Sequence, residues 1–229
     1  MATNDKHFCF IPSRTEEEAS GSKEKAAVLD GVKWGPGRTV TVRFMEGDKG
    51  LRDQVEAVAS EWMQYANVDL SFVDEGDADI RIAFQQGNGS WSYLGTDAGT
   101  IPMDQPTMNY GWLTPDSPND EVRRVVLHEF GHALGLIHEH QNPKRAIQWN
   151  RDAVIQDLSG PPNNWDLATI ENNIFKKYDE EAVTGSEVDS ESIMMYPIPK
   201  AWTLDDFSAG LNSELSSLDK EIIGQAYRR

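Results

Sequence analysis

The chain has 229 residues, a formal net charge of −17 and 38% hydrophobic residues. Such a length is enough for one large domain with a real hydrophobic core, or for two small lobes that share a cleft. The excess of acidic residues argues against nucleic acid as a partner, because a polyanion would be repelled. No apolar run approaches the roughly 20 residues of a membrane helix, so we expect a soluble protein with no membrane partner.

The chain contains a single cysteine, Cys9. An intramolecular disulfide is therefore impossible, which excludes a disulfide-stapled scaffold and any zinc site built from paired cysteines. The first residues also lack the apolar stretch of a secretory signal peptide. Residues 1–31 include a run rich in charged and small residues, and we interpret them as an N-terminal extension, a linker or a pro-segment, ahead of a domain over residues 32–229.

Hydrophobic periodicity predicts strands and helices that alternate through the first half of the chain. Strict alternation of apolar residues favours strands, and apolar residues at helical spacing favour an amphipathic helix. In chain order these elements are a strand over 40–44, a helix over 51–66, a strand over 80–84 and short β-prone pieces at 90–94 and 107–112. This order indicates helices layered on a sheet and not an all-β sandwich.

A further helix is signalled between residues 117 and 135. Ser117 can cap its N-terminus, with Pro118 at the first helical position and Asp120 completing a capping box. Gly135 is a suitable end, because glycine adopts the left-handed conformation that closes many helices. The second half of the chain is less regular and predicts helices over 151–158, 166–178 and 217–227.

Four of the five histidines fall between residues 128 and 140. On a helix, His128 and His132 lie one turn apart and about 40° apart around the axis, so both imidazoles can reach one zinc ion at about 2.0–2.1 Å. Gly135 lets the chain turn out of the helix, so that His138 returns as a third ligand. Three neutral ligands leave one position of the zinc for water, as a hydrolytic site requires.

Three other polar residues belong to this region or to the N-terminal stretch. Glu129 lies beside the first histidine and faces the flank of the helix, where it can hold the zinc-bound water and take its proton as general base. His140 is interpreted as a structural hydrogen-bonding residue, and His7 as a surface residue.

The segment from His128 to His138 resembles the extended zinc-binding motif of the metzincin metalloendopeptidases. Glu139, directly after the third histidine, resembles the astacin branch of that clan. The run Ser-Ile-Met-Met-Tyr at residues 192–196 is similar to the Met-turn of the same clan. In that resemblance Met194 is the methionine beneath the zinc site, and Tyr196 is a residue that can ligate zinc as a fifth ligand and support the transition state.

A second region agrees with this resemblance. Trp91, Ser92 and Tyr93, followed by Leu94 and Gly95, are similar to the edge strand that lines the active-site cleft in the family. We therefore expect an extended peptide substrate to pair with this strand.

An astacin-like zinc metalloendopeptidase implies an α+β fold of two lobes. The upper lobe, about 32–138, would hold a twisted mixed five-stranded sheet with the active-site helix above the cleft. The lower lobe, about 139–229, would be irregular with a C-terminal helix. The resemblance also implies Zn²⁺ as the cofactor, polypeptides as substrates, hydrolysis with Glu129 as the base, and a monomer. Members of the family are mostly secreted and carry disulfides, so the absence of both signals in this chain leaves its localisation unknown.

Several alternatives stay open. The same scaffold could be a catalytically silent, zinc-dependent peptide-binding protein, although the intact Glu129 argues against this, or a zinc hydrolase acting on another bond. The thiolate of Cys9 could ligate zinc, displace the catalytic water and keep the enzyme latent. A lone cysteine equally fits a small buried hydrophobic residue. Cleavage-site preference depends on pocket walls in loops that periodicity does not place.

Overall fold

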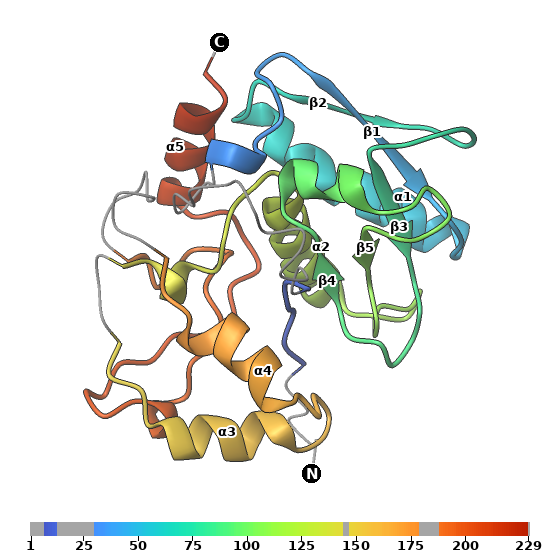
Figure 1. The fold of residues 1–229 in the computed structure, drawn as a ribbon. Helices are drawn as coiled ribbons and strands as arrows, with labels where there is room; N and C mark the ends of the chain where they lie inside the picture. Colours follow the sequence, from blue (N-terminus) through green and yellow to red (C-terminus); the bar gives the residue numbers. More distant parts are fainter. Residues whose placement is uncertain (1–6, 13–29, 144–146, 179–187, 229) are drawn as a thin grey trace.

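The computed structural model describes residues 7–12, 30–143, 147–178 and 188–228. A mixed sheet with helices α1 and α2 forms one lobe, and α3 and α4 lie with long irregular segments in the other (Figure 1). We call these the sheet lobe and the irregular lobe. This two-lobed α and β architecture confirms the fold class expected from the sequence.

Five short strands form the sheet, in the order β2-β1-β3-β5-β4. Neighbouring strands of the sheet are parallel, except that β4 runs antiparallel to β5 and forms one edge of the sheet. The strands are β1 (Thr39–Phe44), β2 (Asp69–Phe72), β3 (Ile80–Ala83), β4 (Trp91–Ser92) and β5 (Met108–Asn109). The strands predicted from the sequence did not include β2, although Leu70 and Phe72 alternate with polar residues there; its pairing with β1 defines it.

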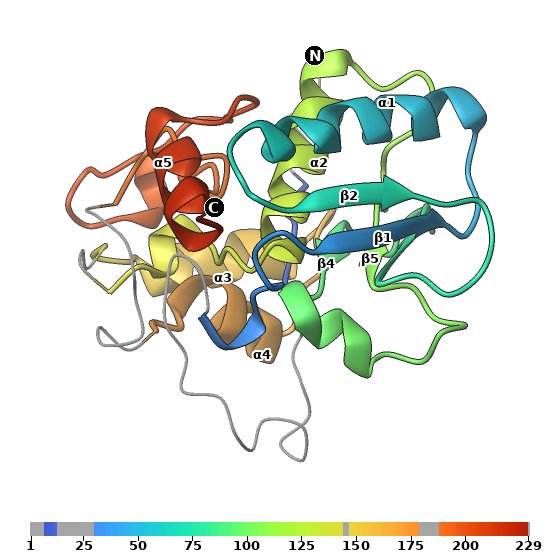
Figure 2. The same cartoon turned by 90° about the horizontal axis from the view of Figure 1, so that it is seen from above.

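Helices α1 and α2 pack on the same face of the sheet, as the view from above shows (Figure 2). Helix α1 (Lys49–Ala59) is capped by Asp48, whose carboxylate accepts from the Leu51 amide at 3.1 Å. It continues as a 3₁₀ helix over Ser60–Gln64, so the predicted helix over 51–66 is present but changes its type at residue 60.

Helix α2 (Asn119–Ala133) carries the histidine motif. The predicted N-cap is wrong: Pro118 occupies the cap position, and the Ser117 hydroxyl instead accepts from the Thr114 amide at 2.9 Å, within the preceding turn. The predicted end is confirmed. Gly135 has φ +90°, and the amides of Gly135 and Leu136 donate to the carbonyls of His132 and Gly131, which is a Schellman motif.

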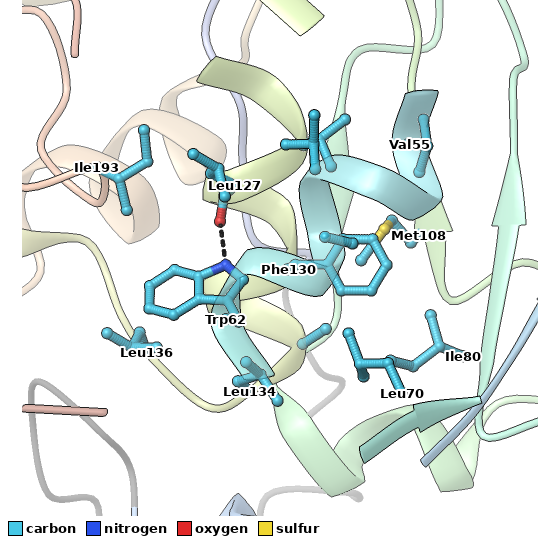
Figure 3. Close-up of a cluster of buried hydrophobic side chains, with 14 of the residues drawn as sticks. Val55, Trp62, Leu70, Ile80, Met108, Leu127, Phe130, Leu134, Leu136 and Ile193 are labelled. Carbon is cyan, nitrogen blue, oxygen red and sulfur yellow. Dashed lines mark hydrogen bonds between the residues drawn. The ribbon is translucent and has the colours of Figure 1, made fainter. Parts of the chain in front are cut away.

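The core of the sheet lobe lies between α1, α2 and the sheet. Trp62 is fully buried, and its indole N–H donates to the Leu127 carbonyl at 3.1 Å (Figure 3). Phe130 of α2 points to the same cluster. These contacts hold α2 in place, and with it the face that carries the histidines.

The irregular lobe has its own core around α3 (Arg151–Ser159) and α4 (Leu167–Ile170). The predicted helix over 166–178 ends early, because α4 passes into a single π-turn over Glu171–Phe175. The C-terminal α5 (Ser217–Ala226) returns to the core of the sheet lobe through Ile222 and Ile223. Within the described part of the chain, helices with the length and hydropathy of a membrane span are absent.

Candidate metal centre and cleft

Three buried histidines meet at the end of α2. His128 and His132 project from the same helix face, and the turn at Gly135 returns His138 to them. One nitrogen from each ring lies within 4.8 Å of the others. The spacing within the motif therefore places three imidazoles at one point, as predicted.

The outer nitrogen of each ring is held by a protein oxygen. His128 Nδ1 lies 2.8 Å from the Ile193 carbonyl, His132 Nδ1 lies 2.8 Å from the Leu136 carbonyl, and His138 Nδ1 lies 3.2 Å from Gln141 Oε1. A carbonyl can only accept, so Nδ1 carries the hydrogen in His128 and His132, and Nε2 presents a lone pair.

The inner nitrogens fit a metal ion. His128 Nε2 is buried and has no hydrogen-bond partner, and the Nε2 atoms of His132 and His138 lie 3.1 Å apart. Burial lowers the pKa of all three imidazoles, that of His132 to about 4, which keeps the rings neutral. Neutral, oriented imidazoles with unshared lone pairs are the donor set that zinc prefers.

Glu129 lies beside this centre and is fully buried. Neither of its carboxylate oxygens has a hydrogen-bond partner. Burial raises its pKa to about 8, against the opposing effects of Cys9 and Arg124. A buried carboxylate without partners is costly for folding, and such groups are typical of sites where a proton is transferred.

The Met-turn region lies next to the histidines. The Tyr196 ring stands 4.2 Å from the His138 ring, measured between centroids, and its hydroxyl donates to the Cys9 carbonyl. Met194 lies against Gly131 of α2, so closely that a Cβ at Gly131 would overlap its sulfur. From the sequence, only the family resemblance indicated that the Met-turn lies near the histidine motif. The fold brings the two regions into contact.

Residues 7–12 lie between the sheet lobe and the irregular lobe (Figure 1). Phe10 forms a parallel bridge with Trp91, and its amide donates to the Ser90 carbonyl at 3.0 Å. The predicted substrate strand is therefore paired with the chain's own N-terminal segment. On the other side, the amides of Phe8 and Ile11 donate to side-chain oxygens of the irregular lobe.

Cys9 lies in the middle of this segment and is 2% exposed. Burial raises the pKa of its thiol well above the ordinary value, and Glu129 acts in the same direction. Cys9 therefore lies in one buried region with Glu129 and with Tyr196, whose hydroxyl donates to the Cys9 carbonyl. His7, expected at the surface, is partly exposed, and its ring stacks on Trp112 with centroids 4.8 Å apart.

Three residues around the metal centre were not predicted from the sequence. Gln141 orients His138, Asp219 holds the Met-turn from α5, and Arg124 lies one turn before His128 in the wall of the cleft. Of these, only Arg124 could have been found from the sequence, because it precedes the expected zinc ligand His128 by one helical turn. His140, interpreted as structural, lies with Nε2 2.8 Å from the Asn173 carbonyl.

Comparisons with known proteins agree with this geometry. The family model Astacin, which describes a family of peptidases, matches residues 30–228. The chain is 23% identical over 246 residues to the protein SpAN of Strongylocentrotus purpuratus, covering 99% of this chain and 36% of that protein. It is 26% identical over 175 residues to the zinc metalloproteinase nas-38 of Caenorhabditis elegans, and the match covers 76% of this chain and 21% of that protein. The chain thus spans at most 36% of the length of these curated relatives.

Solved structures are similar as well. A structure of myroilysin has a TM-score of 0.85 and 43% identity, and the match covers 88% of this chain and 98% of that chain. The hatching enzyme HCE-1 of Oryzias latipes (medaka), a zinc protease, has a TM-score of 0.58 and 17% identity, and the match covers 86% of this chain and 95% of that chain. At this identity the likeness shows the fold alone. With a family match from residue 30 to residue 228 and three histidines grouped to bind a metal ion, the chain belongs to the astacin family of zinc-dependent metalloendopeptidases.

Proposed function

We propose that this chain cleaves internal peptide bonds with zinc held by His128, His132 and His138, and that Glu129 is the general base. One observation supports this most strongly. The buried Nε2 atom of His128 and both carboxylate oxygens of Glu129, the next residue in the chain, have no hydrogen-bond partner. Zinc bound there supplies Lewis-acid chemistry, since it lowers the pKa of a water ligand and polarises a carbonyl.

The chain's own residues would handle the protons and the charge. Glu129 would accept the proton of the attacking water and return it to the departing amine. Tyr196 would donate its hydroxyl hydrogen to the oxyanion, as it now donates to the carbonyl of Cys9. The carbonyl of Cys9 therefore stands where a substrate carbonyl would be stabilised.

A test of this function replaces Glu129 by glutamine, which keeps the shape and removes the base. With zinc-loaded chains treated briefly with trypsin to release the N-terminal segment, we expect casein hydrolysis by the variant to be at least about a hundredfold below that of wild type, while zinc content is retained. Glu56→Gln, on the exposed face of α1, is the matched control and should keep full activity. Cleavage that a chelator does not abolish would overturn the proposal, and binding of casein without cleavage would favour the silent peptide-binding alternative.

We also propose that the N-terminal segment keeps the enzyme latent, with the Cys9 sulfur as a zinc ligand in place of water. The support is the course of the segment. Cys9 lies beside Glu129, and its neighbours Phe8 and Phe10 are anchored to opposite lobes. Because the segment pairs with the edge strand and passes the metal centre, a peptide must displace it to enter, and a bond from the Cys9 sulfur to zinc would hold it in place.

Latency is tested with the full chain and its Cys9→Ala variant, both loaded with zinc. Removing the thiol should raise peptidase activity before any cleavage of the chain, because water then regains its place. Cys9→Ser is the closer control, since a hydroxyl is a weak zinc ligand of similar size. Equal activity of the three proteins before cleavage would overturn latency by Cys9.

A further inference from the structure

We propose that Trp91 and Trp165 form an aromatic subsite, which selects substrates with an aromatic side chain next to the residue whose carbonyl is attacked. The proposal rests on the endopeptidase function above and adds a chemical class of substrate to it. It follows from the places that Phe8 and Phe10 of the N-terminal segment now occupy.

The ring of Phe10 lies between two tryptophans, one from each lobe. Its centroid is 6.5 Å from that of Trp91 on the edge strand β4, and 6.2 Å from that of Trp165 in the irregular lobe. The contact with Trp165 is edge to face, with an angle of 75° between the ring planes. At such distances and angles aromatic pairs attract one another beyond the effect of their buried area. The two lobes together therefore hold one aromatic ring.

Gly89 keeps the place of this ring open. A Cβ at this position would lie 2.7 Å from a ring carbon of Phe10, much closer than two carbon atoms pack. The backbone of Gly89 also has φ +71°, which side chains other than hydrogen rarely allow. The chain before the edge strand is thus shaped to leave room for a ring.

Trp165 meets a second ring of the segment. Its centroid is 6.3 Å from that of Phe8, again edge to face. Because Phe8 and Phe10 both contact Trp165, their side chains lie on the same side of the segment, with Cys9 between them. The Cys9 carbonyl accepts from the Tyr196 hydroxyl, where a substrate carbonyl would be stabilised. A substrate residue on either side of that carbonyl's residue would therefore place its side chain where Phe8 or Phe10 now lies, whichever way the substrate runs.

Release of the segment would expose these aromatic surfaces to water. Trp165 is now 9% exposed, and the rings of Phe8 and Phe10 cover it. An aromatic side chain of the substrate would bury the same area again and restore the ring contacts, which a leucine cannot do. Beside Phe10 and Trp165 lies a cavity of about 380 Å³, so the larger rings of tyrosine and tryptophan should be accepted too.

The experiment uses fluorogenic alanine-glycine peptides with one Phe or one Leu, placed in turn at each position around the scissile bond. Product masses identify the bond that is cut. Full-length chains are loaded with zinc and treated briefly with trypsin, which does not cut these peptides because they lack Lys and Arg. Where the variable residue adjoins the one whose carbonyl is attacked, wild type should prefer Phe to Leu by about fivefold in kcat/KM, on one side at least.

Variants in the two lobes separate recognition from a structural role. Trp165→Leu and Trp91→Leu should each at least halve the preference for Phe, while cleavage of the Leu peptide stays within about twofold of wild type. A merely structural role would lower cleavage of both peptides alike. Trp165→Phe keeps an aromatic ring and should retain part of the preference. If Trp165→Leu does not fold, Trp91→Leu, at a partly exposed residue, tests the subsite by itself.

Tyr65→Leu is the matched control. Tyr65 is an exposed aromatic residue whose ring meets Lys220 of α5, and its loss should leave the ratio of Phe to Leu cleavage unchanged.

The outcomes also distinguish the two proposals. If wild type cleaves the peptides without preferring Phe at either adjoining position, or if both tryptophan variants keep the preference, the aromatic subsite is overturned and the peptidase function stands. If treated, zinc-loaded wild type cleaves neither these peptides nor casein, the function itself is overturned, and the subsite with it.

Discussion

At the scale of single residues, Gly131 shows how tightly the metal centre is built. Alanine normally stabilises a helix interior by about 1 kcal/mol relative to glycine. Here a Cβ would overlap the Met194 sulfur and come within 3.4 Å of the Trp62 ring. Because the overlap forces a buried side chain aside, Gly131→Ala should lower the free energy of unfolding by about 1–3 kcal/mol and reduce zinc content.

Urea unfolding and metal analysis check this prediction. Gly99→Ala is the control, since nothing lies within 4 Å of its Cβ position. In a Met194→Ala background the cost of Gly131→Ala should largely disappear, because the overlapping atom is gone. A Gly131→Ala protein as stable as wild type would contradict the argument.

At the scale of elements, Asp219 joins helix α5 to the Met-turn. Its carboxylate completes the capping box of α5 and accepts from the Ser192 hydroxyl at 2.6 Å and the Ile193 amide at 2.8 Å. The carbonyl of Ile193 in turn meets His128 Nδ1. Asp219→Ala leaves these buried donors unpaired, so we expect the free energy of unfolding to fall by about 2–4 kcal/mol.

Chemical unfolding measures the loss, and zinc affinity reports its effect on the histidine. Asp219→Asn keeps one acceptor oxygen and should lose less. Glu221→Ala, on the exposed side of the same helix, should change stability by less than about 0.5 kcal/mol. An Asp219→Ala protein with unchanged stability and zinc affinity would show that the link is not needed.

At the scale of the whole molecule, the N-terminal segment joins the two lobes. Phe8 is 4% exposed and stacks on Trp202 in the core of the irregular lobe, with centroids 5.3 Å apart. Phe8→Ala should therefore cost about 3 kcal/mol in the free energy of unfolding. Because it also weakens the hold of the segment, peptidase activity of the uncleaved chain should rise.

Thermal unfolding and a peptidase assay test the two effects together. Leu167→Ala, at an exposed leucine of α4, is the control for loss of an apolar side chain and should change neither quantity. A destabilised Phe8→Ala protein that stays as inactive as wild type would show that the segment contributes to packing alone.

Zinc itself should stabilise the whole molecule. The three histidines are bonded to Ile193, Leu136 and Gln141, so the ion joins α2 to segments that follow it in the chain. At a zinc concentration about a thousand times its dissociation constant, binding adds about 4 kcal/mol. A chelator should lower the melting temperature, and added zinc should restore it; a melting temperature that zinc does not change would contradict the site.

Much of the candidate site was determined by the sequence alone. The spacing of His128 and His132 is a property of any α-helix, and Gly135 permits a turn that few other residues adopt, so local rules were sufficient. The five-stranded sheet followed from the family resemblance, while periodicity indicated only some of its strands. The cap of α2 was predicted wrongly, because Ser117 satisfies the turn before the helix and not the helix itself.

Tertiary structure alone decided where distant segments meet. Cys9 and Phe8 are far in sequence from Tyr196 and Trp202, and only the folded chain places them in one cleft. The bond between Asp219 and the Met-turn and the cavity beside Arg124 likewise join residues that no local pattern connects. The physical reason is that periodicity reports which face of an element is apolar, whereas the partner of that face is selected by packing the entire chain.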